Sequence, residues 1–370
     1  MKKKILAVIL SAAMVLSLAA CGKSNTATND NTDTTDKTVS TESADSGSAS
    51  SDSANSGKKF KVGMVTDVGG VNDGSFNQTS WEGLQKASKD LGVEVKYLES
   101  ETDADYAPNI ETFVDDDYDL IICVGYMLAD AMRASAEANP DQKYAIIDDA
   151  SCADLPNVTC LMFEQSQASY LAGVVAGMMT KSNKVGFVLG MSNETMNEFG
   201  YGYLAGVLDT NPNATVSQYN ANSFGDTAVG KSAAVSMITD GVDVIFHAAG
   251  GTGLGVIEGC KENGIWAIGV DTDQSSLAPD NILTSAMKRV DTACYDITKD
   301  LINGNLTNGI ITYDLASNGV DIAPTTDNLT DEVINKVNET KTKIINGEIT
   351  VPKTKDEFEA KYGDVYELDD

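Results

Sequence analysis

Short apolar runs alternate with amphipathic stretches along most of the chain after residue 59. Runs of this length, bounded by Gly, Asp or Asn, are typical of strands in a parallel sheet, and the stretches between them have helical periodicity. The alternation therefore predicts successive β and α units and an α/β fold. The predicted strands cover residues 61–65, 93–97, 120–124, 144–147, 158–163, 184–190, 215–219, 242–246 and 266–270.

The strand pattern restarts at residue 184, which predicts two similar doubly wound halves that follow one another. Gly or Asp comes directly after several of the predicted strands, at Asp67, Asp148, Gly250 and Asp271. Ligands of open α/β sheets bind outside the carboxyl ends of the strands. If the two halves face each other across a cleft, these residues converge on it.

The first 20 residues have the layout of a secretory signal. Three lysines precede an apolar run over residues 5–20, which is too short for a comfortable membrane span. The run ends in Leu18-Ala19-Ala20-Cys21, which resembles the lipobox of bacterial lipoproteins. This resemblance implies that residues 1–20 are removed and that Cys21 is lipidated and becomes the new N-terminus.

Residues 21–58 are expected to form a disordered linker behind the lipidated cysteine. The segment consists almost entirely of Ser, Thr, Asn, Asp, Ala and Gly, with no aromatic residue before residue 59. Such a composition buries too little apolar surface to offset the entropy of ordering.

The charge of the chain argues against a nucleic acid as partner. The formal net charge is −29 and becomes −32 once the three signal lysines are removed, so the molecule repels phosphate groups. A metal site is also not indicated, because there is one histidine and no CxxC pair. Cys152 and Cys160 could form a disulfide in an oxidising exterior, but spacing alone does not decide this.

Two loops carry an aromatic residue beside a predicted strand end. Phe76 lies in the Gly-rich segment 66–77, where Asp73 or Ser75 could cap the following helix, and Phe224 lies in the corresponding loop 222–226 of the second half. Taken alone, the first loop is as compatible with a capped turn that carries a core phenylalanine as with a ligand site. Together, the two rings could stack on both faces of a flat ligand.

Polar candidates follow in the second half. The run 248–255 is rich in glycine but has the spacing GxGxG without GK[ST], so it does not indicate a nucleotide-phosphate site, although its amides could bind a hydroxyl. Asp271 could accept hydrogen bonds from adjacent sugar hydroxyls, and Lys288 could donate one. A tight turn and a surface lysine remain the alternatives for the loop and for Lys288.

The sequence offers little for catalysis. His247 follows an apolar strand and is more often a core residue than a general base in that position. No GxSxG elbow and no supported Cys/His pair occurs. The pair Asp148 and Asp149 could do acid and base work, yet such pairs are expected by chance in so acidic a chain.

Several of these segments together resemble the basic membrane protein family of lipoproteins, the purine nucleoside receptor type of ABC-transporter substrate-binding protein. The resemblance covers nearly all of the folded region. It is carried by DVGGVNDGSFNQTSW at 67–81, FEQSQASYLAGVVAG at 163–177, FGYGYLAGV at 199–207, the run 248–255, IGVDTDQ at 268–274 and the segment 284–290.

The resemblance implies a type I periplasmic-binding-protein fold, with two doubly wound parallel-sheet lobes joined by three crossovers. The crossovers are expected near Glu164, Ala286 and Val320. Lobe 1 would then contain residues 59–164 with 287–319, and lobe 2 residues 165–286 with 320–370.

The same resemblance implies roles for individual residues. Phe76 and Phe224 would sandwich a purine base, and Asp67 with either Asp148 or Asp149 would bind its edge. The ribose would be bound by Gly250, Asp271 and Lys288, with Asn77 and Tyr126 as neighbours in the cleft.

We expect that the protein is not an enzyme and that it uses no cofactor. It is anchored on the extracytoplasmic face of the cell membrane and passes a purine nucleoside to an ABC permease. Two alternatives stay open, a sugar or signalling-molecule receptor of the same fold and a secreted nucleoside hydrolase; the latter would need a positioned water or metal.

Overall fold

The computed structural model describes residues 58–363, which lie within one compact unit. The expected signal segment 1–20, the expected lipidation site Cys21 and the expected linker up to residue 57 lie outside the described residues. No helix among residues 58–363 is both long and apolar enough to cross a bilayer.

The first sheet contains six strands in the order β11-β5-β4-β3-β1-β2, all paired in parallel. Residues 120–124 and 144–147 are buried throughout, as continuous apolar runs in a sheet covered on both faces should be. Strand β2 begins one residue after its predicted start. The strands are β1 (Lys61–Val65), β2 (Glu94–Leu98), β3 (Leu120–Val124), β4 (Tyr144–Ile147), β5 (Val158–Phe163) and β11 (Gly309–Tyr313).

The second sheet repeats this arrangement in the order β12-β10-β9-β8-β6-β7. Its pairs are parallel except for β12, which runs antiparallel to β10. The α/β fold class and the two doubly wound halves are therefore confirmed. The strands are β6 (Lys184–Leu189), β7 (Thr215–Asn220), β8 (Val244–Ala248), β9 (Trp266–Asp271), β10 (Ile282–Lys288) and β12 (Val320–Ile322).

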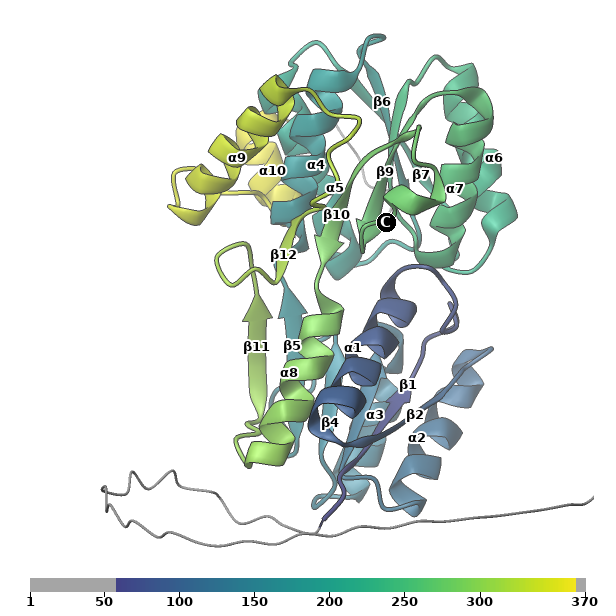
Figure 1. The fold of residues 1–370 in the computed structure, drawn as a ribbon, viewed down its shortest axis with the longest axis vertical. Coiled ribbons are helices and arrows are strands. Elements are labelled where there is room, and N and C mark those ends of the chain that lie inside the picture. Colours follow the sequence, from purple (N-terminus) through teal and green to yellow (C-terminus); the bar gives the residue numbers. More distant parts are fainter. Residues whose placement is uncertain (1–57, 364–370) are drawn as a thin grey trace, which may run out of the picture. The chain divides into compact units, whose positions relative to one another are not determined.

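Helices α1, α2, α3 and α8 pack around the first sheet, and helices α4 to α7 with α9 and α10 surround the second (Figure 1). Short 3-10 turns lie at Asp103–Asp105, Tyr126–Leu128 and Ser275–Leu277. The helices are α1 (Phe76–Leu91), α2 (Tyr106–Asp115), α3 (Ala129–Ala138), α4 (Gln165–Met179), α5 (Glu194–Thr210), α6 (Thr227–Thr239), α7 (Gly250–Asn263), α8 (Val290–Asn303), α9 (Asp331–Ile345) and α10 (Lys355–Tyr362).

The chain passes between the two sheets three times, after β5, after β10 and after β11. Strand β10 continues to Lys288, past the boundary predicted at residue 286, because Met287 and Lys288 pair with β12. The sheet membership of the strands otherwise follows the expected limits of the two lobes. The division into lobes itself stays a prediction.

Helices α4 and α5 pack closely because glycines lie between them. A Cβ at Gly173 would lie 2.2 Å from the carbonyl oxygen of Tyr203, and one at Gly206 would lie 2.1 Å from that of Tyr170. This contact fixes α5, whose first turns contribute Met196 and Phe199 to the site described below. The five described cysteines are free and buried, including Cys152 and Cys160.

Candidate ligand-binding site

One cavity lies at the carboxyl ends of the strands of both sheets. Ligands of open α/β sheets bind at this edge. All nine residues singled out as ligand contacts line it: Asp67, Phe76, Asn77, Tyr126, Asp148, Phe224, Gly250, Asp271 and Lys288. The structure thus brings together residues up to 221 positions apart in the chain.

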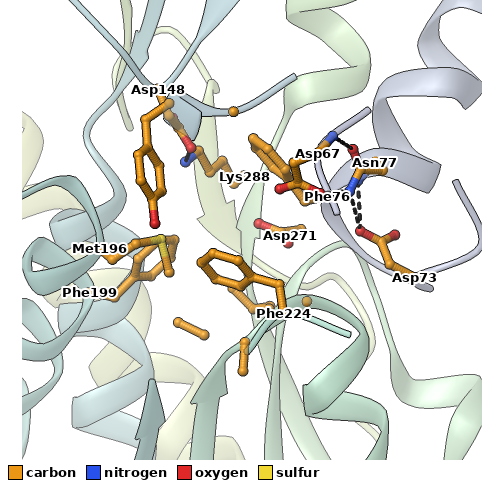
Figure 2. A pocket seen from close by; sticks show the side chains of 16 residues that line it. Asp67, Asp73, Phe76, Asn77, Asp148, Met196, Phe199, Phe224, Asp271 and Lys288 are labelled. Atoms are coloured by element: carbon orange, nitrogen blue, oxygen red, sulfur yellow. Dashed lines mark hydrogen bonds and ion pairs between the residues drawn. The ribbon is translucent and has the colours of Figure 1, made fainter. Parts of the chain in front are cut away.

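The loop between β1 and α1 is held by two buried carboxylates. Asp73 caps α1, because its carboxylate accepts hydrogen bonds from the backbone N–H groups of Ser75, Asn77 and Gln78 at 2.9–3.1 Å. Asp67 Oδ1 accepts from Asn77 Nδ2 at 2.7 Å and from the backbone of Gly69 at 2.8 Å. Asn77 is therefore fixed between two aspartates, as Figure 2 shows.

Phe76 and Phe224 approach the cavity from different sheets. Phe76 begins α1 on the first sheet, and Phe224 lies in the loop between β7 and α6 on the second. Figure 2 shows the two labelled rings on different sides of the enclosed space. Phe224 is 9% exposed, and its ring lies against Gly190, where a Cβ would come within 2.3 Å of it.

Lys288 is buried and forms an ion pair at the end of β10. Its Nζ lies 2.5 Å from Asp148 Oδ2, and the side chains are 2% and 6% exposed. The ammonium also lies 5.2–5.4 Å from the ring centroids of Phe76, Phe163 and Phe199, which is within cation–π range. Lys288 is therefore a buried cation beside the cavity, and the alternative of a surface lysine was wrong.

Two aspartates at strand ends adopt the left-handed backbone conformation, Asp148 with φ 67° and Asp271 with φ 65°. Few residue types other than glycine tolerate this region, and aspartate is one of them. Asp148 directly follows β4 and Asp271 is the last residue of β9, and each of these strands is the fourth of its half in chain order. The two halves therefore present a carboxylate in the same way. Ser75 Oγ donates a hydrogen bond to Asp271 Oδ2.

Burial shifts the acids of the site toward the neutral form. It raises the pKa of Asp271 to about 7, although Lys288 and the hydrogen bond from Ser75 act in the opposite direction. It also raises the pKa of Asp67 to about 6, against the hydrogen bonds from Asn77 and Gly69. Both carboxyl groups thus titrate near neutral pH.

The glycine-rich run begins helix α7 at Gly250, which has φ 52°. The N–H of Thr252 donates to the carbonyl oxygen of Phe224 at 3.1 Å. This amide is therefore engaged in holding the loop of Phe224, and Gly250 is the member of the run that lines the cavity together with Ala248 and Ala249.

The sequence left open whether Asp148 or Asp149 faces the cavity, and the two differ in the structure. Asp148 is 4% exposed and lines the cavity. The Asp149 carboxylate accepts hydrogen bonds from the backbone and the hydroxyl of Ser151 and does not line the cavity.

Sequence reasoning missed several lining residues. Gly125 follows β3 directly, so the rule about strand ends would have identified it. Met196 and Phe199 lie in the first turns of α5, which follows β6, and the same rule points to them less directly. Asp73 was considered only as a helix cap.

His247 does not reach the cavity. It is fully buried in β8, and burial lowers its pKa to about 4, so the imidazole is neutral at pH 7. Its position agrees with the core interpretation of this histidine rather than with a general base.

Comparison with known proteins connects this geometry to a protein family. Residues 60–355 match the family described as ABC transporter substrate-binding protein PnrA-like. The chain is 43% identical over 318 residues to the CD4+ T-cell-stimulating antigen of Listeria monocytogenes serovar 1/2a, covering 80% of this chain and 89% of that protein. It is 38% identical over 314 residues to the ABC transporter nucleoside-binding protein BmpA of Lactococcus lactis subsp. cremoris, covering 79% and 89%.

A similar architecture occurs among solved structures. An ABC transporter solute-binding protein from Aeropyrum pernix K1 superimposes with a TM-score of 0.75 at 27% identity, covering 83% of this chain and 98% of the other. This similarity confirms the expected periplasmic-binding-protein fold.

Proposed function

Because this chain belongs to the PnrA-like family of ABC transporter substrate-binding proteins, we propose that it binds purine nucleosides and delivers them to an ABC permease. The observation that carries the proposal is the pair of rings, Phe76 and Phe224, contributed by different sheets to one cavity. The relative in Lactococcus lactis is named a nucleoside-binding protein, which supports the same ligand class.

The base would lie between Phe76 and Phe224, with its edge toward Asp67. Oδ1 of Asp67 already accepts from Asn77 and Gly69, so Oδ2 is available to accept an N–H of the purine edge. Asp148 is held by Lys288 and presents its second oxygen, Oδ1, for which the described residues offer no hydrogen-bond donor. A donor from the ligand would satisfy that buried atom.

The ribose would lie toward the second sheet, near Gly250, Asp271 and Lys288. A carboxylate can accept hydrogen bonds from two adjacent hydroxyls. Ser75 Oγ donates a hydrogen bond to one oxygen of Asp271, so we propose that a ribose hydroxyl competes for this position.

The charge of the cavity favours nucleosides over nucleotides. Asp67, Asp73, Asp148 and Asp271 line it, whereas Lys288 is its one lining cation among the described residues and is already paired. A phosphate would meet no free cation there, and those of the four carboxyl groups that are ionised would repel it.

Calorimetric titration tests this assignment. Inosine, guanosine or adenosine should bind and raise the melting temperature with increasing ligand excess, whereas ribose, inorganic phosphate and inosine 5′-phosphate should not. Stabilisation by hexoses without any response to the three nucleosides would instead favour a sugar receptor. Release of hypoxanthine from inosine would indicate a hydrolase, since a binding protein returns its ligand unchanged.

Phe224→Ala should weaken inosine binding by about 1–3 kcal/mol, because one face of the base loses its stacking partner. Its effect on ligand-free stability should be smaller than that of Phe246→Ala. Phe246 is a fully buried core residue of β8, and its truncation should cost about 3–5 kcal/mol through the cavity left behind.

Urea melts of both ligand-free variants, combined with calorimetry, separate the two roles of phenylalanine. A large loss of stability in Phe224→Ala with unchanged inosine affinity would assign Phe224 to the core. Phe76 would then be the one remaining residue proposed to stack on the base.

We also propose that the protein is held on the extracytoplasmic face of the cell membrane through lipidated Cys21. Firm attachment by lipid requires more than one acyl chain. Cys21→Ser should therefore release the protein from the membrane fraction while leaving nucleoside binding intact. Retention of the variant after washing would contradict the anchor.

A further inference from the structure

Gln274 joins the two sheets beside the cavity without lining it. It follows β9 and is 2% exposed, and its Nε2 donates a hydrogen bond of 3.0 Å to the carbonyl oxygen of Gly74. Gly74 belongs to the β1–α1 loop and directly precedes Ser75 and Phe76. A side chain of the second half thus holds the loop that carries one of the two aromatic rings.

The orientation of the Gln274 amide follows from its neighbours. Its Oε1 lies 3.0 Å from the backbone nitrogen of Val270, which can only donate, so the oxygen must face Val270 and the NH₂ group must face Gly74. The same Oε1 lies 3.1 Å from His247 Nε2. The neutral imidazole must therefore carry its proton on Nε2 and donate it to the amide.

Two glycines of the second half, Gly269 and Gly253, leave room for the side chains of Gln274 and His247. A Cβ at Gly269 would lie 2.5 Å from both Gln274 Oε1 and Ser285 Oγ, and Ser285 Oγ accepts from the backbone N–H of Gln274 at 3.1 Å. A Cβ at Gly253 would lie 2.0 Å from His247 Nδ1. The glutamine is thus fixed on three sides before it meets Gly74, and little entropy is lost when that bond forms.

We propose that Gln274 is a positioning residue that keeps the two halves closed over the ligand and slows its release. The inference rests on the proposed nucleoside function. The neighbouring contact between Ser75 and Asp271 involves a group that the ribose would need, so the ligand replaces it. The contact between Gln274 and Gly74 involves no such group and persists in the liganded protein.

Gln274→Glu tests this role when measured at alkaline pH, because the ionised side chain removes the donor to Gly74 and keeps an acceptor for Val270 and His247. Burying the Gly74 carbonyl without its donor should raise the Kd for inosine about 10-fold to about 100-fold. The change should lie mainly in the dissociation rate measured by stopped flow, with the association rate within about threefold of that of the wild type.

Gln165→Glu is the matched control. Gln165 is also buried, at 1% exposure, and its Nε2 donates to the carbonyl oxygen of Thr195 at 3.0 Å, but both residues belong to helices of the second half. The same chemical change at this position should leave the dissociation rate of inosine near the wild-type value. Equal acceleration in both variants would overturn the inference, since it would reflect the buried acid and not the lost contact.

The two proposals fail in different ways. If the wild-type protein does not bind inosine, the nucleoside assignment falls and the role of Gln274 falls with it. If the wild type binds and Gln274→Glu releases inosine at the wild-type rate, only the inference about Gln274 is overturned.

Gly74→Ala approaches the same contact from the other side if Gln274→Glu does not fold. Gly74 has φ 63°, a conformation that alanine adopts only with strain, and a Cβ there would press on Leu254 Cδ2 of the second half at 3.1 Å, so the substitution disturbs the loop at this contact. The network around Gln274 stays intact in this variant. Faster release of inosine is expected, and an unchanged rate would overturn the inference.

Discussion

Lys288→Met should destabilise the ligand-free protein by about 3–5 kcal/mol, because it leaves the Asp148 carboxylate buried without its partner. Both side chains are nearly inaccessible, at 2% and 6% exposure, so the carboxylate would lose its partner in a poorly hydrated environment. Asp148 must then remain as an unpaired charge or take up a proton. Urea denaturation measures the loss.

Two further variants test this explanation. Lys288→Met combined with Asp148→Asn removes both charges and should recover part of the lost stability. Lys343→Met breaks an exposed pair with Glu339 and should cost at most about 1 kcal/mol. A loss of similar size in Lys288→Met and Lys343→Met would mean that burial of the pair has no energetic consequence.

Asp271→Asn should reduce the pH dependence of stability between pH 5 and pH 8 by about 2–3 kcal/mol. The pKa of Asp271 rises from 3.8 to about 7 on folding, chiefly through burial. Between these values the folded protein holds a proton that the unfolded chain has released. Its free energy of unfolding therefore falls as the pH rises, and the loss is complete above the folded pKa.

Other groups also contribute to the pH dependence of stability, but the wild type and Asp271→Asn share them. Burial raises the pKa of Glu198 to about 8, which acts in the same direction, and lowers the pKa of His247 to about 4, which acts in the opposite direction. These contributions cancel when Asp271→Asn is compared with the wild type by urea melts at each pH.

Asp273→Asn is the nearest control for the pH series. Burial raises the pKa of Asp273, but hydrogen bonds from Thr325 and Ser275 outweigh this effect and the pKa is lowered overall. Its substitution should therefore change the pH dependence only below about pH 4. Parallel curves for the wild type and Asp271→Asn would show that Asp271 titrates as an ordinary surface acid.

The sequence predicted most strands because buried parallel strands are continuous apolar runs between turn residues. Residues 120–124 and 144–147 are examples, and the structure forms strands over the same residues. Strands β10, β11 and β12 were not predicted. The three residues of β12 contain Asp321 and have no apolar period. Its position depends on pairing with β10, a tertiary contact that local sequence does not encode.

The candidate residues could be predicted because strand ends in a parallel sheet meet at one edge. Asp67, Asp148 and Asp271 were found in this way. The choice between Asp148 and Asp149 could not come from residue type, because both are aspartates; it follows from Asp148 lining the cavity while Asp149 binds Ser151. The enclosure of Lys288 by three aromatic rings likewise required the packing of both halves.

Residue 58, where the described chain begins, and the cavity lie at opposite ends of strand β1. Lys58 precedes the amino end of β1, whereas Asp67 follows the carboxyl end, and five strand residues span roughly 16 Å. A fluorophore or a surface linkage attached at Lys58, whose side chain is 61% exposed, would therefore report from the face opposite the carboxylates. The folded unit could be immobilised there as a biosensor element, at the end of β1 opposite Asp67.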